Sequence, residues 1–385
     1  MLESQRHLFD LPADVAYLNC AYLSPLLKTA AAAGREGIDR KLRPWQVVGK
    51  DFLDGPERAR ALFGQLLGAQ AEDIALVPSA SYGIAIAANN LPLLPGQQVV
   101  VMANEFPSNI EPWRIKAKAV GAVFTVVDWP EDGNWTPAIL AAITPGTAIV
   151  ALPQCHWTDG TLVDLVAVAR RTREVGAALV LDLTQTLGAW PFDLAAVDPD
   201  YAVCAGYKWL FGPYSVGFLY VAPRRRNDVP LEYNYYSRSV DPAFERLVGR
   251  KLPFAVEARR FDVGECANFA LLPVASAGLS QLLDWGIDNI ARTLRPLTEE
   301  IAERGAAMGL RSHPARYRAA HYIGLRFPGG LPHGAAAKLA ERGVHVSQRG
   351  DALRVTPHVY NTRGDVDRLF QALADFAPVS PRLRN

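Results

Sequence analysis

The sequence predicts an α/β fold, with a mainly parallel sheet of about seven strands, helices on both of its faces, and a smaller α+β domain. Two observations support this prediction. Between residues 74 and 222, short apolar runs alternate with segments of helical length. These runs are apolar at successive positions, which is typical of parallel strands covered by helices on either side.

Seven apolar runs have the length of strands in this region: 74–77, 98–102, 123–127, 148–152, 178–182, 201–204 and 216–221. Helical segments such as 164–175, with apolar residues at helical spacing, lie between several of them. Alternating strands and helices of this kind predict βαβ units and hence a parallel sheet.

After about residue 283 the pattern changes. A charged helix is expected at about 291–308, then strands near 322–327, 345–347 and 352–355, and a closing helix from about 365. A chain of 385 residues is long enough for two domains. We therefore expect a large domain at 15–283, and a small α+β domain from 1–14 and 284–385.

Composition excludes several classes of function. Lys and Arg number 40, and Asp and Glu number 39, so no overall charge attracts nucleic acid or an anionic membrane. No apolar stretch is long enough to span a bilayer, and the N-terminus lacks a signal-peptide core. The four cysteines have no metal-ligand spacing, and Cys155 and Cys204 adjoin apolar strands, where burial is expected. We expect a cytoplasmic protein without a metal site.

Side chains capable of chemistry follow five of the expected strands. Ligands of open α/β sheets bind beyond the carboxyl ends of the strands. The candidates at these ends, in chain order, are Ser79 and Ser81, Phe106, His156, Asp182, and Lys208. Their common placement predicts a binding site at one edge of the sheet.

Lys208 lies within Ala-Gly-Tyr-Lys-Trp-Leu-Phe-Gly-Pro, among small and aromatic residues. In an apolar pocket a lysine loses its proton readily and becomes an amine nucleophile that forms Schiff bases. Asp182 ends an earlier apolar strand, and Gln185 follows three residues on. A Schiff-base lysine with a carboxylate for a pyridinium nitrogen is the chemistry of pyridoxal 5'-phosphate (PLP).

With these motifs the chain resembles fold-type I PLP enzymes of the class V aminotransferase group, which includes cysteine desulfurases, kynureninase and isopenicillin N epimerase. The resemblance extends from Tyr17-Leu18-Asn19 to Asp365-Val366-Asp367-Arg368-Leu369. It implies a PLP-transferase fold for the large domain, PLP as cofactor, a small amino-acid substrate and a homodimer.

The resemblance also assigns roles to individual residues. Lys208 matches the Schiff-base lysine, Asp182 the partner of the pyridine nitrogen, and Gln185 a residue that bonds the ring hydroxyl. Ser79, Ala80 and Ser81 correspond to the turn that binds the phosphate, where backbone N–H groups and a helix dipole favour an anion. Tyr207 is expected to add a phosphate contact.

The remaining assignments concern the ring face and the substrate. Phe106 aligns with the residue that stacks over the cofactor, and His156 is expected to bond the ring oxygen or act as an acid or base. Trp157, Asn19 and Arg354 are expected to bind substrate, Arg354 by a bidentate grip on the carboxylate. Structural roles remain as alternatives: a helix N-cap for Asp182, core packing for Phe106, a satisfied histidine for His156 and a surface ion pair for Arg354.

Two features depart from the family pattern. Desulfurases carry a nucleophilic cysteine on a late loop, but residues 330–353 contain none, so desulfurase activity is expected to be absent or marginal. Residues 260–268 correspond to a Gly-Thr turn that reaches the phosphate in the neighbouring subunit. Glu265 stands at the threonine position, which makes that contact unfavourable for a phosphate.

Transamination is the reaction that we expect first. The alternatives are kynureninase-like or C–S lyase chemistry at Cβ, towards which Phe106, Tyr207, His156 and Trp157 lean. A further alternative is a regulator that keeps the fold without turnover, although Lys208, Asp182 and Arg354 are all present and argue against it.

Overall fold

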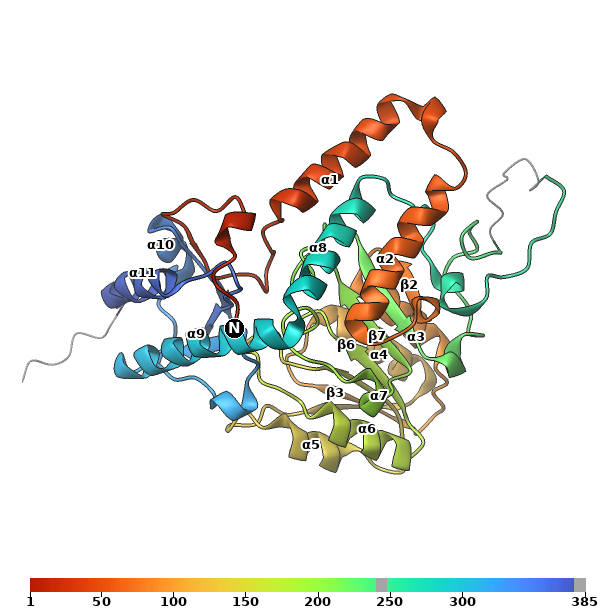
Figure 1. Ribbon diagram of the computed structural model, residues 1–385. Helices are drawn as coiled ribbons and strands as arrows, with labels where there is room; N and C mark the ends of the chain where they lie inside the picture. Colours follow the sequence, from red (N-terminus) through yellow and green to blue (C-terminus); the bar gives the residue numbers. More distant parts are fainter. Residues whose placement is uncertain (240–247, 377–385) are drawn as a thin grey trace, which may run out of the picture.

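The computed structural model describes residues 1–239 and 248–376, and a seven-stranded sheet lies at its centre (Figure 1). β8 runs antiparallel to its two neighbours, and the other neighbouring pairs are parallel, which confirms the mainly parallel sheet. The strand order is β2 (Ile74–Val77), β8 (Gly217–Val221), β7 (Tyr201–Ala205), β6 (Ala178–Asp182), β5 (Thr147–Pro153), β3 (Gln98–Met102) and β4 (Val123–Val127).

Successive residues of the central strands enter two different apolar clusters, because side chains alternate across a sheet. In β6, Leu179 and Leu181 belong to one cluster, and Ala178 and Val180 belong to the other. The first cluster is completed by α2 (Asp51–Leu67), α5 (Trp135–Ala142), α6 (Leu165–Glu174), α7 (Leu194–Val197) and α8 (Leu271–Trp285). The second is completed by α3 (Ala80–Asn90) and α4 (Pro107–Val120), so helices cover both faces as predicted.

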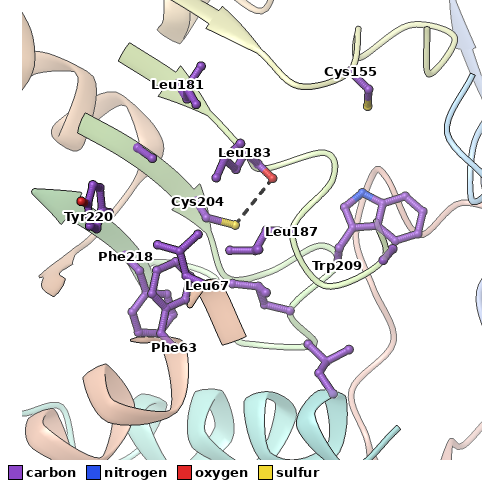
Figure 2. Packing of buried hydrophobic residues seen from close by; sticks show 14 of the residues in the cluster. Phe63, Leu67, Cys155, Leu181, Leu183, Leu187, Cys204, Trp209, Phe218 and Tyr220 are labelled. Carbon is purple, nitrogen blue, oxygen red and sulfur yellow. Dashed lines mark hydrogen bonds between the residues drawn. The ribbon is translucent and has the colours of Figure 1, made fainter. Parts of the chain in front are cut away.

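The packing of the first cluster is dense (Figure 2). Phe63 of α2 stacks on Phe218 of β8, with ring centroids 4.3 Å apart. The thiol of Cys204 donates a weak hydrogen bond to the carbonyl of Leu183. Each fully buried side chain of this size stabilises the fold by about 1.5–3 kcal/mol. Cys155 and Cys204 are both buried, as predicted.

A smaller sheet forms in the C-terminal part of the chain. α9 (Ile287–Ala307) buries one stripe and leads to an antiparallel sheet of β9 (Ile323–Arg326), β12 (Ala352–Val355) and β11 (Ser347–Arg349). α11 (Arg363–Leu373) lies against α9, and α10 (Ala335–Glu341) lies against α11 (Figure 1). A capping box of Thr362 and Asp365 begins α11.

The strand expected near 345–347 is two short strands in different sheets. β10 (Val344–His345) pairs with β1 (Ala16–Tyr17), whereas β11 begins at Ser347 and pairs with β12. The N-terminal segment then continues into α1 (Lys28–Asp39), which packs along α8. β1 therefore hydrogen-bonds to the C-terminal part of the chain, and the division into domains after residues 14 and 283 stays a prediction.

Residues 1–239 and 248–376 contain no helix that is both long and apolar enough to cross a membrane. In the same residues, no three His, Cys, Asp or Glu side chains gather as metal ligands. The features that bear on function are concentrated at the carboxyl ends of the parallel strands.

Candidate active site

A cavity of about 250 Å³ opens at the carboxyl edge of the central sheet. The segments that follow β2, β3, β5, β6 and β7 contribute its walls, in agreement with the predicted placement. Of the predicted site residues, the cavity is lined by Ser79, Ala80, Ser81, Phe106, Trp157, Asp182, Gln185, Tyr207 and Lys208. The structure therefore brings together most of the residues that the sequence singles out.

Lys208 lies just beyond β7 and is only 8% exposed. Its Nζ is 5.5 Å from the ring centroid of Phe106 and 5.4 Å from that of Tyr207. No carboxylate lies within ion-pair distance of Nζ among the residues that the structure describes. Burial lowers the pKa of Lys208 to about 8, although Asp182 opposes this shift. At pH 7 the side chain is therefore mostly protonated, with about a tenth as neutral amine, which is far more than for an exposed lysine.

The position of Lys208 depends on a close approach between two segments of backbone. A Cβ on Gly206 would meet the carbonyl oxygen of Val216 at 2.6 Å, so only glycine fits there. Gly206 donates its N–H to the same carbonyl at 2.8 Å and accepts from Gly212 at 2.9 Å. The loop after β7 is thereby folded back on itself, and it directs Lys208 into the cavity.

Asp182 is the last residue of β6 and is buried. Its Oδ1 accepts the backbone N–H of Thr184 at 2.9 Å. Burial raises the pKa of Asp182, while the hydrogen bonds from Thr184 and the charge of Lys208 oppose the shift. A turn, not a helix, follows this strand, so the alternative role as a helix N-cap does not apply.

Gln185 lines the cavity with an amide that is already held in place. Its Nε2 donates to the carbonyl of Ala21 at 3.3 Å, and its Oε1 accepts from the indole of Trp209 at 2.9 Å. One hydrogen of Nε2 remains for a ligand, because an amide nitrogen carries two donors. The fixed orientation suits a residue that positions a ring oxygen.

The N-terminus of α3 faces the cavity. Ser79 is its N-cap, and the Ser79 Oγ accepts the backbone N–H of Tyr82 at 3.2 Å. The hydroxyls of Ser79 and Ser81 are 2.9 Å apart. The partial positive charge of a helix N-terminus, with free N–H groups and two hydroxyls, forms a site for an anion.

Aromatic side chains form another wall. The rings of Phe106 and Trp157 meet edge to face, with centroids 5.5 Å apart. The indole of Trp157 donates to the carbonyl of Asn104 at 2.7 Å, which fixes its position. Phe106 is 38% exposed, which is unusual for a residue that serves only as core. Its ring is free to stack against a planar ligand.

His156 does not reach the cavity. Its Nδ1 is paired with the hydroxyl of Thr158 at 2.8 Å and its Nε2 with the carbonyl of Ala103 at 3.1 Å, while its ring stacks on Trp135. Burial lowers the pKa of His156 to about 4. These contacts favour the structural alternative, because both ring nitrogens already have partners, and we do not retain a catalytic role.

Arg354 and Asn19 lie behind the wall of the cavity. Arg354 is 1% exposed, and its Nη1 donates to the carbonyl of Trp157 at 3.1 Å and to the hydroxyl of Tyr322 at 3.2 Å. Asn19 Oδ1 accepts from the hydroxyl of Ser347, which is itself 3.5 Å from Arg354 Nη2. In the described residues no carboxylate pairs with Arg354, and its Nε has no partner, so a surface ion pair is excluded.

Two further residues were not among the predicted site residues. Glu105 lines the cavity, and it follows β3 much as Asp182 ends β6, so the strand-end rule was sufficient to find it. The guanidinium of Arg349 lies 5.6 Å from the ring centroid of Trp157. Arg349 lies on β11, and no sequence signal separated it from the other arginines of the chain.

Comparison with known proteins gives the family. A profile described as aminotransferase class-V matches residues 40–369. The uncharacterized aminotransferase YcbU of Bacillus subtilis is 25% identical over 338 residues, covering 84% of this chain and 85% of the relative. A kynureninase of Deinococcus radiodurans is 28% identical over 343 residues, covering 81% of each chain.

Solved structures agree on the fold. A mutant of C-DES with glycine covalently linked to its PLP cofactor superposes with a TM-score of 0.86 at 17% identity, covering 96% of this chain and 99% of that one. At this identity the likeness shows the fold alone, whereas the profile spans most of the chain. The chain therefore belongs to the class-V aminotransferase family, whose cofactor is PLP.

Proposed function

We propose that the protein is a PLP-dependent enzyme that transfers the amino group of a small substrate carrying a carboxylate. The observation that carries this proposal is Lys208, a buried amine without a described carboxylate partner, beside Asp182 in a cavity at the strand ends. An amine of this kind suits covalent attachment to an aldehyde. The relative named aminotransferase in Bacillus subtilis supports the reaction class.

The side chains of the cavity fit PLP. The N-terminus of α3, with Ser79 and Ser81, suits the phosphate, and Asp182 suits the pyridine nitrogen. Lys208 supplies the amine for the aldehyde. The exposed ring of Phe106 supplies a flat apolar surface. The donor set thus offers a partner for each polar group of this cofactor.

PLP supplies the electron sink that stabilises negative charge at the substrate Cα. Lys208 Nζ is first the attachment point and afterwards the base that takes the Cα proton and returns it elsewhere. Its lowered pKa serves both roles, because a base near neutrality exists in both protonation states. Asp182, which accepts the N–H of Thr184, would hold the ring nitrogen in its protonated form.

Arg354 is the proposed group for the substrate carboxylate. Its Nε has no described partner, and its Nη1 is held by Trp157 and Tyr322. A planar guanidinium binds a carboxylate through parallel hydrogen bonds. Because Arg354 is buried and its Nη1 is held by the Trp157 carbonyl, we expect the backbone at Trp157 to shift when substrate binds.

A reaction at Cβ is the second candidate, supported by the kynureninase relative and by phenylalanine at position 106. Cysteine desulfuration is not proposed, because the four cysteines at 20, 155, 204 and 266 are buried and burial raises the pKa of each thiol. A regulator without turnover is disfavoured by the intact set of Lys208, Asp182 and Arg354.

Product analysis with ¹⁵N-labelled amino acids separates these candidates. In transamination the label moves to an added 2-oxo acid, and turnover stops without the acceptor. In Cβ chemistry a side-chain fragment is released without any acceptor. If amino acids bind but no product forms under either condition, the regulator is correct and our proposal fails.

We also propose a homodimer, in a cytoplasmic location. The turn between α1 and α2 exposes Leu42, Trp45 and Val48, and Trp45 is 77% exposed. Apolar side chains gathered in one segment are typical of an interface. Glu265 belongs to the segment that the family resemblance places near the neighbouring subunit. It is exposed, and its backbone is in the left-handed region with φ of 59°. Light scattering is expected to give the mass of a dimer, and a monomer that remains active would contradict this.

A further inference from the structure

Glu105 lines the same cavity as Lys208 and Asp182 and is 6% exposed. Its Oε1 accepts the backbone N–H of Phe106 at 2.5 Å. Its Oε2 is buried and has no hydrogen-bond partner among the residues that the structure describes. An ionised carboxylate with one bare oxygen is costly in such a place, whereas a protonated carboxyl costs less and carries a donor.

The charges around Glu105 indicate where the proton resides. The titratable groups that face it are Lys208, Asp182 and the thiol of Cys155, so a single cation lies among two carboxyls. Asp182 is the better anion, because the backbone and the side chain of Thr184 both donate to it. Glu105 has only the Phe106 N–H.

Burial raises the pKa of Glu105 to about 8. The N–H of Phe106 and the charge of Lys208 oppose the shift, and the charge of Asp182 adds to it. Like-charged carboxyls in one desolvated site do not ionise together, so the less well solvated member keeps its proton. The geometry and the charge distribution therefore agree.

We propose that Glu105 is a neutral carboxylic acid at neutral pH, and that its carboxyl, whose Oε2 is buried in the cofactor-free cavity, turns to donate a hydrogen bond to an oxygen of the bound cofactor. A neutral acid can lie beside a phosphorylated, anionic cofactor, which an ionised carboxylate would repel. Only the identity of the acceptor rests on the proposed function. The protonation of Glu105 follows from the cavity of the protein alone.

Variants of similar size test whether the Glu105 carboxyl donates a hydrogen bond to PLP. Absorbance titration measures the PLP affinity of each variant. Glu105→Gln keeps a neutral donor and is expected to bind PLP within about threefold of the native protein. Glu105→Met keeps the size without the donor and is expected to bind roughly tenfold more weakly. Glu111→Gln, on the exposed face of α4, is the matched control and leaves the affinity unchanged.

Two outcomes of this titration overturn the proposal. Equal losses in Glu105→Gln and Glu105→Met would mean that the negative charge is what matters. Native affinity in Glu105→Met would mean that no hydrogen bond is donated. Because each variant is compared with the other at constant size, a general effect of packing does not imitate the expected pattern.

Infrared difference spectra of the cofactor-free protein test the protonation state without PLP. The native protein minus Glu105→Gln is expected to show a carboxylic-acid C=O band at pH 7 that disappears as the pH rises above about 8. Carboxylate bands at pH 7 in its place would overturn the inference. If PLP does not bind at all, the proposed function fails, and this spectrum still decides the state of Glu105.

Discussion

Two buried cations of the protein differ in their surroundings. Arg60 is fully paired with a carboxylate, whereas Lys208 faces the cavity at the strand ends. Arg60 lies beneath the central sheet and donates to both oxygens of Asp262, at 3.2 and 2.8 Å. Asp262 also accepts the N–H of Leu76. Lys208 at the strand ends is also buried. Among the residues that the structure describes, no carboxylate lies within ion-pair distance of its Nζ.

The difference separates structural charges from functional ones. Burial lowers the pKa of Arg60, but Asp262 and other nearby acidic groups together raise it by more, so the guanidinium stays charged. Burial raises the pKa of Asp262, and the Arg60 guanidinium and the N–H of Leu76 oppose that shift. Burial lowers the pKa of Lys208 and nothing compensates fully, so the amine becomes reactive. A buried charge with complete pairing stabilises one conformation, whereas a perturbed group beside a cavity is a candidate for chemistry.

The largest effect is expected for Lys208→Ala. Loss of the attachment point and of the base should lower turnover by roughly 10²–10⁴-fold, with little change in the free energy of unfolding. Steady-state kinetics and chemical denaturation measure the two quantities on one preparation. A variant that retained native turnover would show that the unpaired lysine is not the functional charge.

Arg60→Met is expected to lower stability and to spare the attachment of PLP, because it leaves Asp262 buried and uncompensated. The free energy of unfolding should fall by about 3–5 kcal/mol, while the folded protein still attaches PLP. The matched control is Arg114→Met, because the Arg114–Glu111 pair is exposed and is worth about 1 kcal/mol or less. Equal losses in the two variants would remove the distinction between paired and surface charges.

Much of the fold was predictable, because parallel strands covered on both faces are apolar throughout. The residues at the strand ends were predictable for the same reason, since topology alone brings Ser79, Asp182 and Lys208 to one edge. The orientation of His156 was not, because it depends on Trp135 and on the carbonyl of Ala103 in other segments. The split between β10 and β11 depends on the pairing of β10 with β1, which is distant in the sequence.

A smaller effect is expected for Arg354→Ala, which removes another buried cation without a described carboxylate partner. Binding of a carboxylate substrate should weaken by about 1.5–3 kcal/mol, the scale of charged hydrogen bonds, while the spectrum of bound PLP stays unchanged. Spectral titration with an amino acid and with its amine analogue lacking the carboxylate measures the effect. Equal weakening of both ligands would show that Arg354 is structural.

The most gradual effect is expected in the pH dependence of stability of the cofactor-free protein, because it is spread over several pH units. Glu105 has a folded pKa of about 8, above its unfolded value, so its stabilising contribution is lost as the pH rises from about 4 to 8. Lys208 has a folded pKa below its unfolded value, so stability rises with pH between about 8 and 10. Each slope is at most about 1.4 kcal/mol per pH unit.

Denaturation curves of the native protein and Glu105→Gln over this pH range separate the two contributions. The variant should lose the decrease below pH 8 and keep the increase above it. An unchanged profile below pH 8 would mean that Glu105 is ionised in the folded protein.

Borohydride reduction of the PLP-loaded protein, followed by peptide mapping, tests whether Lys208 is the amine that holds PLP. One reduced adduct is expected, on the peptide that contains Lys208. Lys116 is the informative competitor, because its pKa is also lowered by burial while its Nζ is held by the carbonyls of Ala88 and Leu91. An adduct on Lys116, or on any lysine other than Lys208, would show that a different amine holds the cofactor.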